Sequence, residues 1–253
     1  MIPTHNKAGT LSRAIVSAAC QNPLEVLVID DASTDDTPGI VEQLRGVYPC
    51  IRYVRHAKKS PDWQEALASF YPSLAGTHVV MMGADDALIH GIIDSIEKHQ
   101  HAAVVFHDYY VCTPDDKITH GVTCGYTVTT ELDAQATQHR IIHWPYPSET
   151  GIGAGIRREH LVWLSQRQWW LMGPWSDCIG YGVAAALYGC VYVPKAGALF
   201  TQDPAGYGAK GRSGLDQAKY FDAVQTFVDG FALPAEVRRS MCVRREVPYE
   251  WNR

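Results

Sequence analysis

The sequence lacks several features that would assign it to a broad class of proteins. Its apolar runs are far shorter than the ~18 residues that a membrane-spanning helix needs, so we expect no transmembrane segment. Pro3, His5, Asn6 and Lys7 interrupt any early apolar stretch, which argues against a signal peptide. The seven cysteines are scattered without a C-x-x-C pair, so the pattern favours neither a zinc ribbon nor a dithiol redox motif. We expect free thiols and a cytoplasmic location.

A strong charge excess is missing too. The 253 residues carry a net charge of −5, so no overall field favours a polyanion such as nucleic acid. With 46% apolar residues the chain can bury a core, and its length suits one large α/β domain or two small ones. The exception is a basic C-terminal tail beside Tyr249 and Trp251, which is either a solvated end or a binding surface. Its arginines are Arg238, Arg239, Arg244, Arg245 and Arg253.

The first hundred residues contain a regular alternation of apolar, strand-like runs and helical segments. Predicted strands cover residues 1–4, 24–29, 51–54 and 79–82, and predicted helices cover residues 14–19, 40–44 and 63–70. Thr10 or Ser12 is expected to cap the first helix, and Thr34 or Asp35 the second. This alternation predicts an α/β fold with a mostly parallel, Rossmann-type sheet flanked by helices.

Two of the predicted strands end in adjacent acids. Asp30 and Asp31 follow the second strand, and Asp85 and Asp86 follow the fourth. Ligands bind at the carboxyl ends of strands in open α/β sheets, so we expect the four carboxylates to border one crevice. Neighbouring carboxylates in such a place suit a hard cation such as Mn²⁺ or Mg²⁺. The alternative is that the acids cap turns or the helices that follow.

Three motifs in the same order carry a family resemblance. They are Pro3-Thr4-His5-Asn6, residues 28–35 (VIDDASTD) and Gly83-Ala84-Asp85-Asp86. These resemble P-T-Y-N, V-D-D-G-S-T-D and D-A-D-D, the signature of the family 2 glycosyltransferases of GT-A fold. The resemblance implies an enzyme that transfers a sugar from a nucleotide donor.

The resemblance also implies a layout for the chain. A single GT-A-like domain would cover residues 1–253, with the nucleotide-sugar site in residues 1–100. Residues 101–253, which include a C-terminal helix and the basic tail, would bind the acceptor. The donor, most simply a UDP-sugar, would contact Pro3, Thr4, His5, Asp30, Asp31, Ala84 and Asp85.

Roles for these donor-site residues follow from the same resemblance. Thr4 and His5 would line the base pocket, and Asp31 would accept a hydrogen bond from a base N–H. Asp85 and Asp86 would hold Mn²⁺ or Mg²⁺, which would assist departure of the nucleotide. Gly83 replaces the first acid of the usual Asp-x-Asp pattern, and the two later acids remain.

The second half holds the candidates for acceptor binding and catalysis. Helices are predicted over residues 89–99 and 215–231, and strands over residues 102–106, within 121–130 and over 191–194. A Gly-rich segment over residues 200–214 could close as a lid. Asp177 heads a predicted helix and, by the resemblance, would be the base of an inverting hexosyl transfer to a glycan or other hydroxyl. The alternative is an ordinary helix cap. Candidate acceptor residues are Gly153, Trp170 and Trp175, and the alternative for the indoles is core packing.

Three other interpretations stay open. A nucleotidyltransferase would need a Gly-rich basic loop after the first strand, and residues 4–9 match that poorly. A non-catalytic carbohydrate- or nucleotide-binding relic of the fold is compatible with Gly83 and the aromatic second half. A nucleic-acid acceptor fits the basic tail, although the net negative charge disfavours it.

Overall fold

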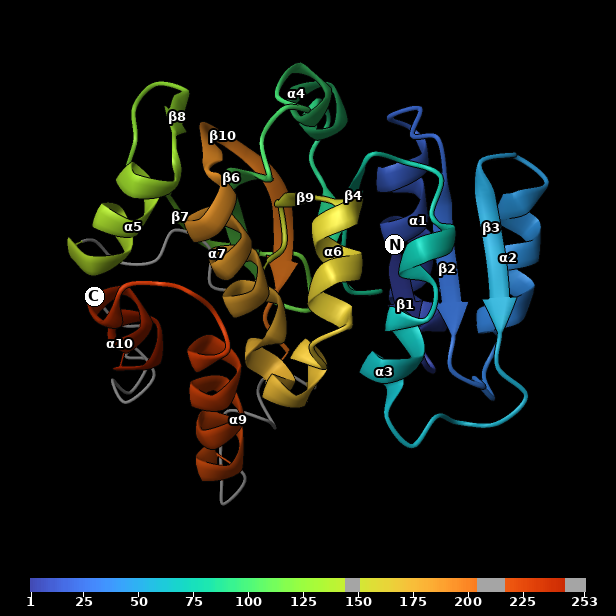
Figure 1. The fold of residues 1–253 in the computed structure, drawn as a ribbon. Helices are drawn as coiled ribbons and strands as arrows, with labels where there is room; N and C mark the ends of the chain where they lie inside the picture. The colour runs from blue at the N-terminus through green and yellow to red at the C-terminus, as the bar shows by residue number, and fades with distance from the viewer. Residues whose placement is uncertain (144–150, 204–216, 244–253) are drawn as a thin grey trace.

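A sheet assembled from two parts forms the centre of the fold. In this computed structural model, which describes residues 1–143, 151–203 and 217–243, β1 (Ile2–Thr4), β2 (Val26–Asp30) and β3 (Ile51–Arg55) pair in parallel. The register sets Thr4 opposite Asp30 and Asp30 opposite Arg55. The three strands therefore end at one edge, toward which β2 and β3 point in Figure 1.

The fourth strand continues this sheet. The backbone nitrogen of Met1 donates to the carbonyl of Val80 at 2.7 Å, and the Met82 N–H donates to the carbonyl of Met1 at 3.2 Å. This is the pattern of parallel neighbours, so β4 (His78–Val80) lies beside β1 and runs the same way. The acids that follow β2 and β4 consequently share an edge.

The second part of the sheet is mixed. β9 (Gly155–Arg157) is antiparallel to both β4 and β6 (Val104–Cys112), and β10 (Cys190–Thr201) is parallel to β6. Hence β4, β6 and β10 point the same way as β1 to β3, as expected of a mostly parallel sheet. Shorter antiparallel strands complete it: β5 (Ala87–Leu88) and β8 (Thr130–Leu132) on β10, and β7 (Ile118–Val122) on β6.

Helices cover both faces of the sheet, and the strands alternate accordingly. Val26 and Val28 face one core with α1 (Ala8–Ala19), α2 (Thr37–Arg45) and α4 (Ile92–Lys98). Leu27 and Ile29 face the other core. Its helices are α3 (Trp63–Ala68), α5 (Ala134–His143), α6 (Arg158–Ser165), α7 (Ser176–Tyr188), α9 (Gln217–Asp229) and α10 (Ala235–Val243). Figure 1 shows α6 and α7 in front of the second half of the sheet.

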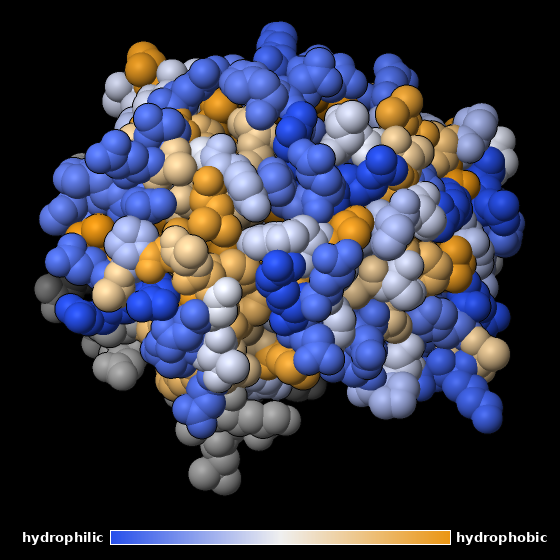
Figure 2. All heavy atoms as spheres, viewed as in Figure 1, coloured by the Kyte–Doolittle hydropathy of each residue, from blue (hydrophilic) through white to orange (hydrophobic). Residues whose placement is uncertain are grey.

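Two 3₁₀ turns, Tyr71–Ser73 and Trp169–Trp175, precede β4 and α7. Within the described ranges, no helix combines the length and hydropathy that a bilayer crossing requires. The face in Figure 2 is hydrophilic around much of its rim, with apolar residues gathered over α7 and its neighbours.

Thr10, Ser12 and Thr34 do not cap the helices as predicted, whereas the Asp35 carboxylate accepts the Thr37 N–H at the start of α2 and the Ala8 N–H at the start of α1, both at 3.0 Å. α1 follows Lys7 and α2 follows Asp36, and neither N-cap side chain accepts a hydrogen bond from its helix. The loops before these helices are instead tied to each other across the sheet edge. The adjacent acids Asp85 and Asp86 do not cap a helix either, because β5 follows them directly.

Several element boundaries differ from the sequence-based prediction. β4 ends at Val80, because the chain turns there toward Gly83 and the acids. α4 begins only at Ile92, because Gly91 adopts a left-handed conformation with φ 94°. β10 runs to Thr201, so the start of the predicted Gly-rich lid belongs to a strand. Residues 204–214 of that lid lie outside the described residues, and α5 was not predicted.

Candidate active site

The loops that follow β1, β2 and β3 are joined at the carboxyl edge of the sheet. The Asp31 N–H donates to the carbonyl of Thr4 at 2.9 Å, and the His56 N–H donates to the carbonyl of Asp30 at 2.9 Å. Asn6 has a left-handed φ of 53°, a conformation that Asn tolerates better than most residues. Its side-chain oxygen accepts the Thr34 N–H at 2.7 Å. These bonds fix the three loops relative to one another.

Asp30 supports the turn after β2. Its side chain is fully buried, with Oδ1 accepting the Ser33 N–H at 2.8 Å and Oδ2 accepting the Tyr53 hydroxyl at 2.8 Å. Arg55 lies 3.5 Å from Oδ2 and balances the charge. Burial and the hydrogen bond to Asp30 raise the pKa of Tyr53, so this phenol stays a donor. Both oxygens of Asp30 are thus engaged inside the protein.

Asp31 keeps one oxygen available. Its Oδ1 accepts the Ser60 N–H at 2.8 Å and lies 3.1 Å from His56 Nδ1, while no partner among the described residues contacts Oδ2. Burial opposes the charge of Asp31, but hydrogen bonds from Ser60 and His56 outweigh it and lower the pKa of this carboxyl. An ionised carboxylate with a free oxygen can accept an N–H from a nucleotide base.

The remaining residues of the first motif border Asp31. His5 Nδ1 lies 2.8 Å from the carbonyl of Asp31, and because a carbonyl only accepts, Nδ1 carries the proton. The Thr4 hydroxyl is buried and has no hydrogen-bond partner in the described part of the chain. Pro3 is half-buried. This places Thr4 and His5, the two predicted base-pocket residues, next to the predicted base acceptor.

Asp86 occupies a different position from the one predicted for a metal ligand. Only 5% of the residue is exposed. Its Oδ1 accepts the Thr201 N–H at 2.8 Å and its Oδ2 accepts the Gly83 N–H at 2.9 Å. Burial and the neighbouring charge of Asp85 raise the pKa of Asp86 to about 7. Both oxygens bind backbone, so the geometry does not fit Asp86 as a ligand and suits a role in shaping the loop.

Asp85 is the more exposed carboxylate of this pair. Its Oδ2 accepts from Lys7 Nζ at 2.7 Å, and its backbone carbonyl accepts from both Arg13 and the Thr201 hydroxyl. Ala84 is buried in the core, so its side chain faces away from a donor. A Cβ at Gly83 would lie 2.8 Å from both Asp85 Oδ1 and Asp86 Oδ2. The missing first acid therefore has no room unless these carboxylates move.

One carboxylate is available for a divalent ion here. Across residues 1–143, 151–203 and 217–243, no group of three His, Cys, Asp or Glu side chains could hold a metal. Mg²⁺, however, is often held by one or two carboxylates together with substrate phosphates and water. Asp85 offers one such carboxylate beside the loops that follow β1 and β2, with its Oδ2 paired to Lys7 at 2.7 Å.

Asp177 lies in the first turn of α7, at the same edge of the sheet. Because β9 is antiparallel to β4 with Gly155 opposite Val80, residues 151–154 lie beyond the carboxyl end of β4. Gly151 in that segment packs against the Asp177 carboxylate: a Cβ at Gly151 would lie 2.6 Å from Asp177 Oδ2. The predicted base and the acid-bearing β4 loop are thereby brought to one side of the molecule.

Buried tyrosines lie near Asp177. Burial, with the charge of Asp177, raises the pKa of both Tyr71 and Tyr181. Trp169 stacks on Tyr181 with ring centroids 6.1 Å apart and is itself buried, so its indole serves core packing. The Tyr181 hydroxyl has no hydrogen-bond partner among the residues described.

The candidate acceptor residues have unequal positions. Trp170 is half-buried and packs against the core. Gly153 is buried, and its carbonyl accepts from His107 Nδ1 at 2.8 Å, so its backbone is held inside the protein. Trp175 ends the second 3₁₀ turn, and its side chain lies outside the described residues. The prediction that these three residues bind an acceptor stays a prediction.

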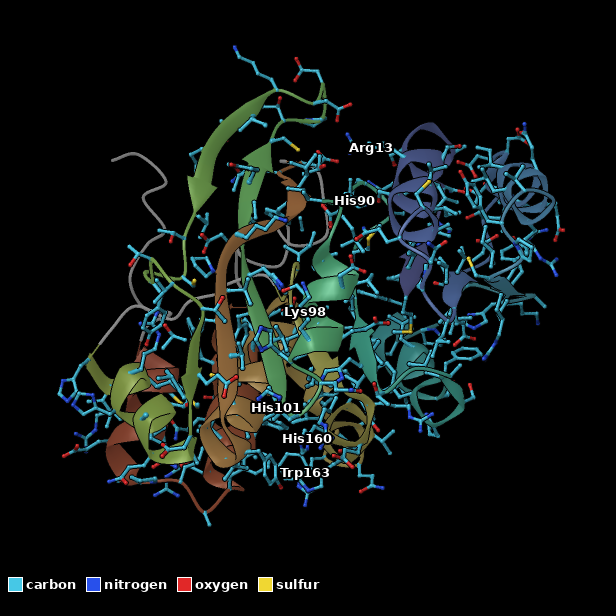
Figure 3. All side chains as sticks on the ribbon, turned by 90° about the horizontal axis from the view of Figure 1, so that it is seen from above. Arg13, His90, Lys98, His101, His160 and Trp163 are labelled. Carbon is cyan, nitrogen blue, oxygen red and sulfur yellow. The ribbon has the colours of Figure 1, made fainter. Side chains whose placement is uncertain are left out.

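Arg13 and Thr201 contact the site and were not predicted as site residues from the sequence. Arg13 extends from α1 to Asp116 in the β6–β7 turn, to the Asp85 carbonyl and to the Thr201 hydroxyl at 3.1 Å. Figure 3 shows Arg13 at one end of the molecule, with His101, His160 and Trp163 at the other. Arg13 is 188 positions from Thr201 in the chain, and no local motif marks such a contact.

Family comparison places these loops in a known context. The profile of glycosyl transferase family 2 matches residues 1–163, more than half of the chain, including the three motifs and their loops. The chain belongs to glycosyl transferase family 2. The family resemblance predicted from the motifs is therefore confirmed.

Curated relatives of this family 2 chain are distant. It is similar to chondroitin synthase of Escherichia coli, with 23% identity over 190 residues, which are 74% of this chain and 25% of that protein. It is also similar to the uncharacterised glycosyltransferase MG060 of Mycoplasma genitalium, with 26% identity over 122 residues, which are 44% of this chain and 41% of that protein. The chain thus spans well under half the length of these relatives.

Solved structures agree on the fold. S. aureus TarS 1–349 in complex with UDP-GlcNAc matches with a TM-score of 0.71 and 16% identity, covering 97% of this chain and 70% of that chain. The mannosyltransferase PcManGT of Pyrobaculum calidifontis, in complex with GDP-Man and Mn²⁺, matches with a TM-score of 0.61 and 16% identity, covering 97% and 67%. The predicted GT-A-like α/β fold is confirmed.

Proposed function

We propose that this family 2 chain transfers a hexose from a nucleoside diphosphate donor to a hydroxyl group with inversion at the anomeric carbon. The observation that carries the proposal is the meeting of the β1, β2 and β4 loops with Asp177 at one edge. The free Oδ2 of Asp31 supports a base contact, and Asp85 supports a phosphate-side contact. Residues 1–100 would bind the donor and residues 101–253 the acceptor.

We favour a UDP-sugar as the donor. Asp31 Oδ2 can accept the single ring N–H that uracil presents, and His5 and Thr4 would bound the ring. TarS, whose fold match has the higher TM-score of the two solved structures above, was solved with UDP-GlcNAc. Lys7, whose ammonium group lies 2.7 Å from Asp85, would face the negative charge of the diphosphate.

The proposed cofactor is Mn²⁺ or Mg²⁺, held by Asp85 and not by Asp86. When bound, the ion would neutralise charge on the departing nucleoside diphosphate. Mn²⁺ in the PcManGT complex supports this choice of cation. Asp86 and Gly83 fix the loop that presents Asp85, through the hydrogen bond between them at 2.9 Å.

Asp177 is the proposed general base. It would take the proton of the acceptor hydroxyl as that oxygen attacks the anomeric carbon from the face opposite the leaving group, which inverts the configuration. The acceptor itself is proposed only as a glycan or another hydroxyl compound. The cytoplasmic location predicted from the sequence stays a prediction.

Asp177→Asn tests the assignment of the base. General base catalysis contributes about 10²–10⁴-fold, so we expect turnover of UDP-GlcNAc with a panel of p-nitrophenyl glycosides to fall at least ~100-fold. UDP affinity, measured by calorimetry, should stay within about twofold, because Asp177 lies outside the nucleotide loops. Asp94→Asn, on the exposed face of α4, makes the same charge change away from the edge and serves as control. Wild-type turnover in Asp177→Asn would overturn the assignment.

A further inference from the structure

Gly151 makes a contact that no other residue type could make. Its φ is +63°, and an ideal Cβ built on it would lie 2.6 Å from Asp177 Oδ2, 2.9 Å from Asp177 Cβ and 3.0 Å from Asp177 Cγ. Real side chains essentially never approach so closely, so any substitution at Gly151 must displace the Asp177 side chain. The backbone of Gly151 therefore limits the positions that the Asp177 carboxylate can adopt.

A second glycine two residues on provides a natural comparison. Gly153 has a similar φ of +73°, but its ideal Cβ would meet only Ala198 Cβ at 3.5 Å and two backbone atoms at 3.8 Å. These are ordinary van der Waals distances. The two glycines therefore impose a similar backbone strain on alanine. They differ in that Gly151 touches Asp177.

Hydrogen bonds hold the turn that contains Gly151 in place. The carbonyl of Gly153 accepts from His107 Nδ1 at 2.8 Å, and His107 Nε2 lies 2.9 Å from the Ser95 hydroxyl of α4. The Ala154 N–H donates to the carbonyl of Gly151 at 3.2 Å, which closes a tight turn. Gly151 is thus anchored through its turn to β6 and α4 and has little freedom to yield.

Hydrogen bonds from α3 hold the start of α7 in place. Gln64 of α3 donates through Nε2 to the Gly173 carbonyl at 3.3 Å and to the Ser176 hydroxyl at 3.2 Å. Ser176 directly precedes Asp177. The helix turn that carries the carboxylate is therefore held by Gln64 of the first half of the chain, and the turn that contains Gly151 is held by His107 of β6, which Ser95 of the first half supports.

We propose that Gly151 is a positioning residue that sets the direction of the Asp177 carboxylate toward the acceptor. The proposal rests on the proposed role of Asp177 as base. It assigns to the Gly-rich run a function in aiming the base, in place of the direct acceptor contact predicted for Gly153. A base displaced by an ångström loses much of its efficiency, since proton transfer requires hydrogen-bond reach.

The kinetic test compares Gly151→Ala with Gly153→Ala. With UDP-GlcNAc and the best acceptor of the p-nitrophenyl glycoside panel, we expect Gly151→Ala to lower kcat at least tenfold more than Gly153→Ala. UDP affinity should be alike in both variants. Equal losses of kcat in the two variants, while Asp177→Asn is inactive, would overturn the positioning role alone. An active Asp177→Asn variant would overturn the proposed base and the inference with it.

A stability cycle tests the contact without any substrate. Asp177→Gly removes all three close atoms but leaves the backbone strain of alanine at positive φ. In the Asp177→Gly background, the loss of melting temperature caused by Gly151→Ala should therefore shrink to about the loss caused by Gly153→Ala. Gly153→Ala should cost the same in both backgrounds. A cost of Gly151→Ala that does not depend on residue 177 would show that the two residues do not contact and would overturn the proposal.

Discussion

At the residue scale, the proposed donor site depends on single carboxylates, and Asp31 illustrates this best. It lies next to Asp30 in the chain, yet one oxygen of Asp31 has no partner in the described residues, whereas Asp30 uses both of its oxygens. We expect Asp31→Asn to weaken UDP binding about tenfold, since hydrogen bonds to charged groups contribute about 1.5–3 kcal/mol. Calorimetry with UDP measures this, with Asp94→Asn as control. Unchanged affinity would remove Asp31 from the base pocket.

Removing the hydroxyl group should change the free energy of unfolding in opposite directions at two tyrosines near the site. The Tyr181 hydroxyl is buried without a partner among the described residues, and the ring stacks on Trp169 with or without it. We expect Tyr181→Phe to raise the free energy of unfolding by about 1 kcal/mol. Tyr53→Phe removes a 2.8 Å hydrogen bond to buried Asp30 and should lower it by about 1–2 kcal/mol. Urea unfolding at pH 7 measures both, and a destabilised Tyr181→Phe would mean that the hydroxyl has a partner.

At the scale of elements, His107 joins α4, β6 and the segment after residue 150, and this makes stability depend on pH. Burial lowers the pKa of His107 to about 4, from an ordinary value near 6.5. Between these values the unfolded chain binds a proton that the folded chain does not, so the free energy of unfolding falls as the pH falls from 6.5 to 4. At about 1.4 kcal/mol per pH unit the loss approaches roughly 3 kcal/mol.

His107→Asn isolates this contribution. Its amide can still donate to the Gly153 carbonyl but does not titrate, so the stability advantage of the wild type over the variant should shrink as the pH falls through this window. Urea unfolding at pH 7, 6, 5 and 4.5 measures the difference. His90→Asn, an exposed histidine labelled in Figure 3, should follow the wild type throughout. A constant gap between wild type and His107→Asn would contradict the assignment.

The sequence predicted some elements well and others poorly, for physical reasons. β2 and the start of β6 were found because their apolar runs are continuous, and the acid pairs marked the carboxyl ends of β2 and β4. The predicted strand ended at Pro194 because proline and the nearby Gly197 are typical of turns, yet pairing with β6 carries β10 to Thr201 through two register shifts. α10 was taken as part of a basic tail, although Val237 and Met241 bury one face of it. Tertiary packing decided both cases.

At the scale of the whole molecule, local sequence could place each loop but not the contacts between distant loops. The nucleotide motifs reach one edge because parallel strands end together, which their order predicts. Arg13 and Thr201 complete that edge from opposite ends of the chain, and the different roles of Asp85 and Asp86 depend on the Thr201 N–H. A contact over more than a hundred residues leaves no periodicity or spacing in the sequence. The layout into a donor half and an acceptor half stays a prediction.

The measurement that tests the central claim most directly is a thermal shift of the intact chain with UDP, GDP, CDP and dTDP, each with Mn²⁺ and with EDTA. A ligand that binds the folded state alone raises the melting temperature by mass action. We predict a shift with UDP that grows with Mn²⁺ and is smaller in Asp31→Asn at the same UDP concentration. No shift with any of the four nucleotides would contradict a donor site at this edge and favour a carbohydrate-binding relic of the fold.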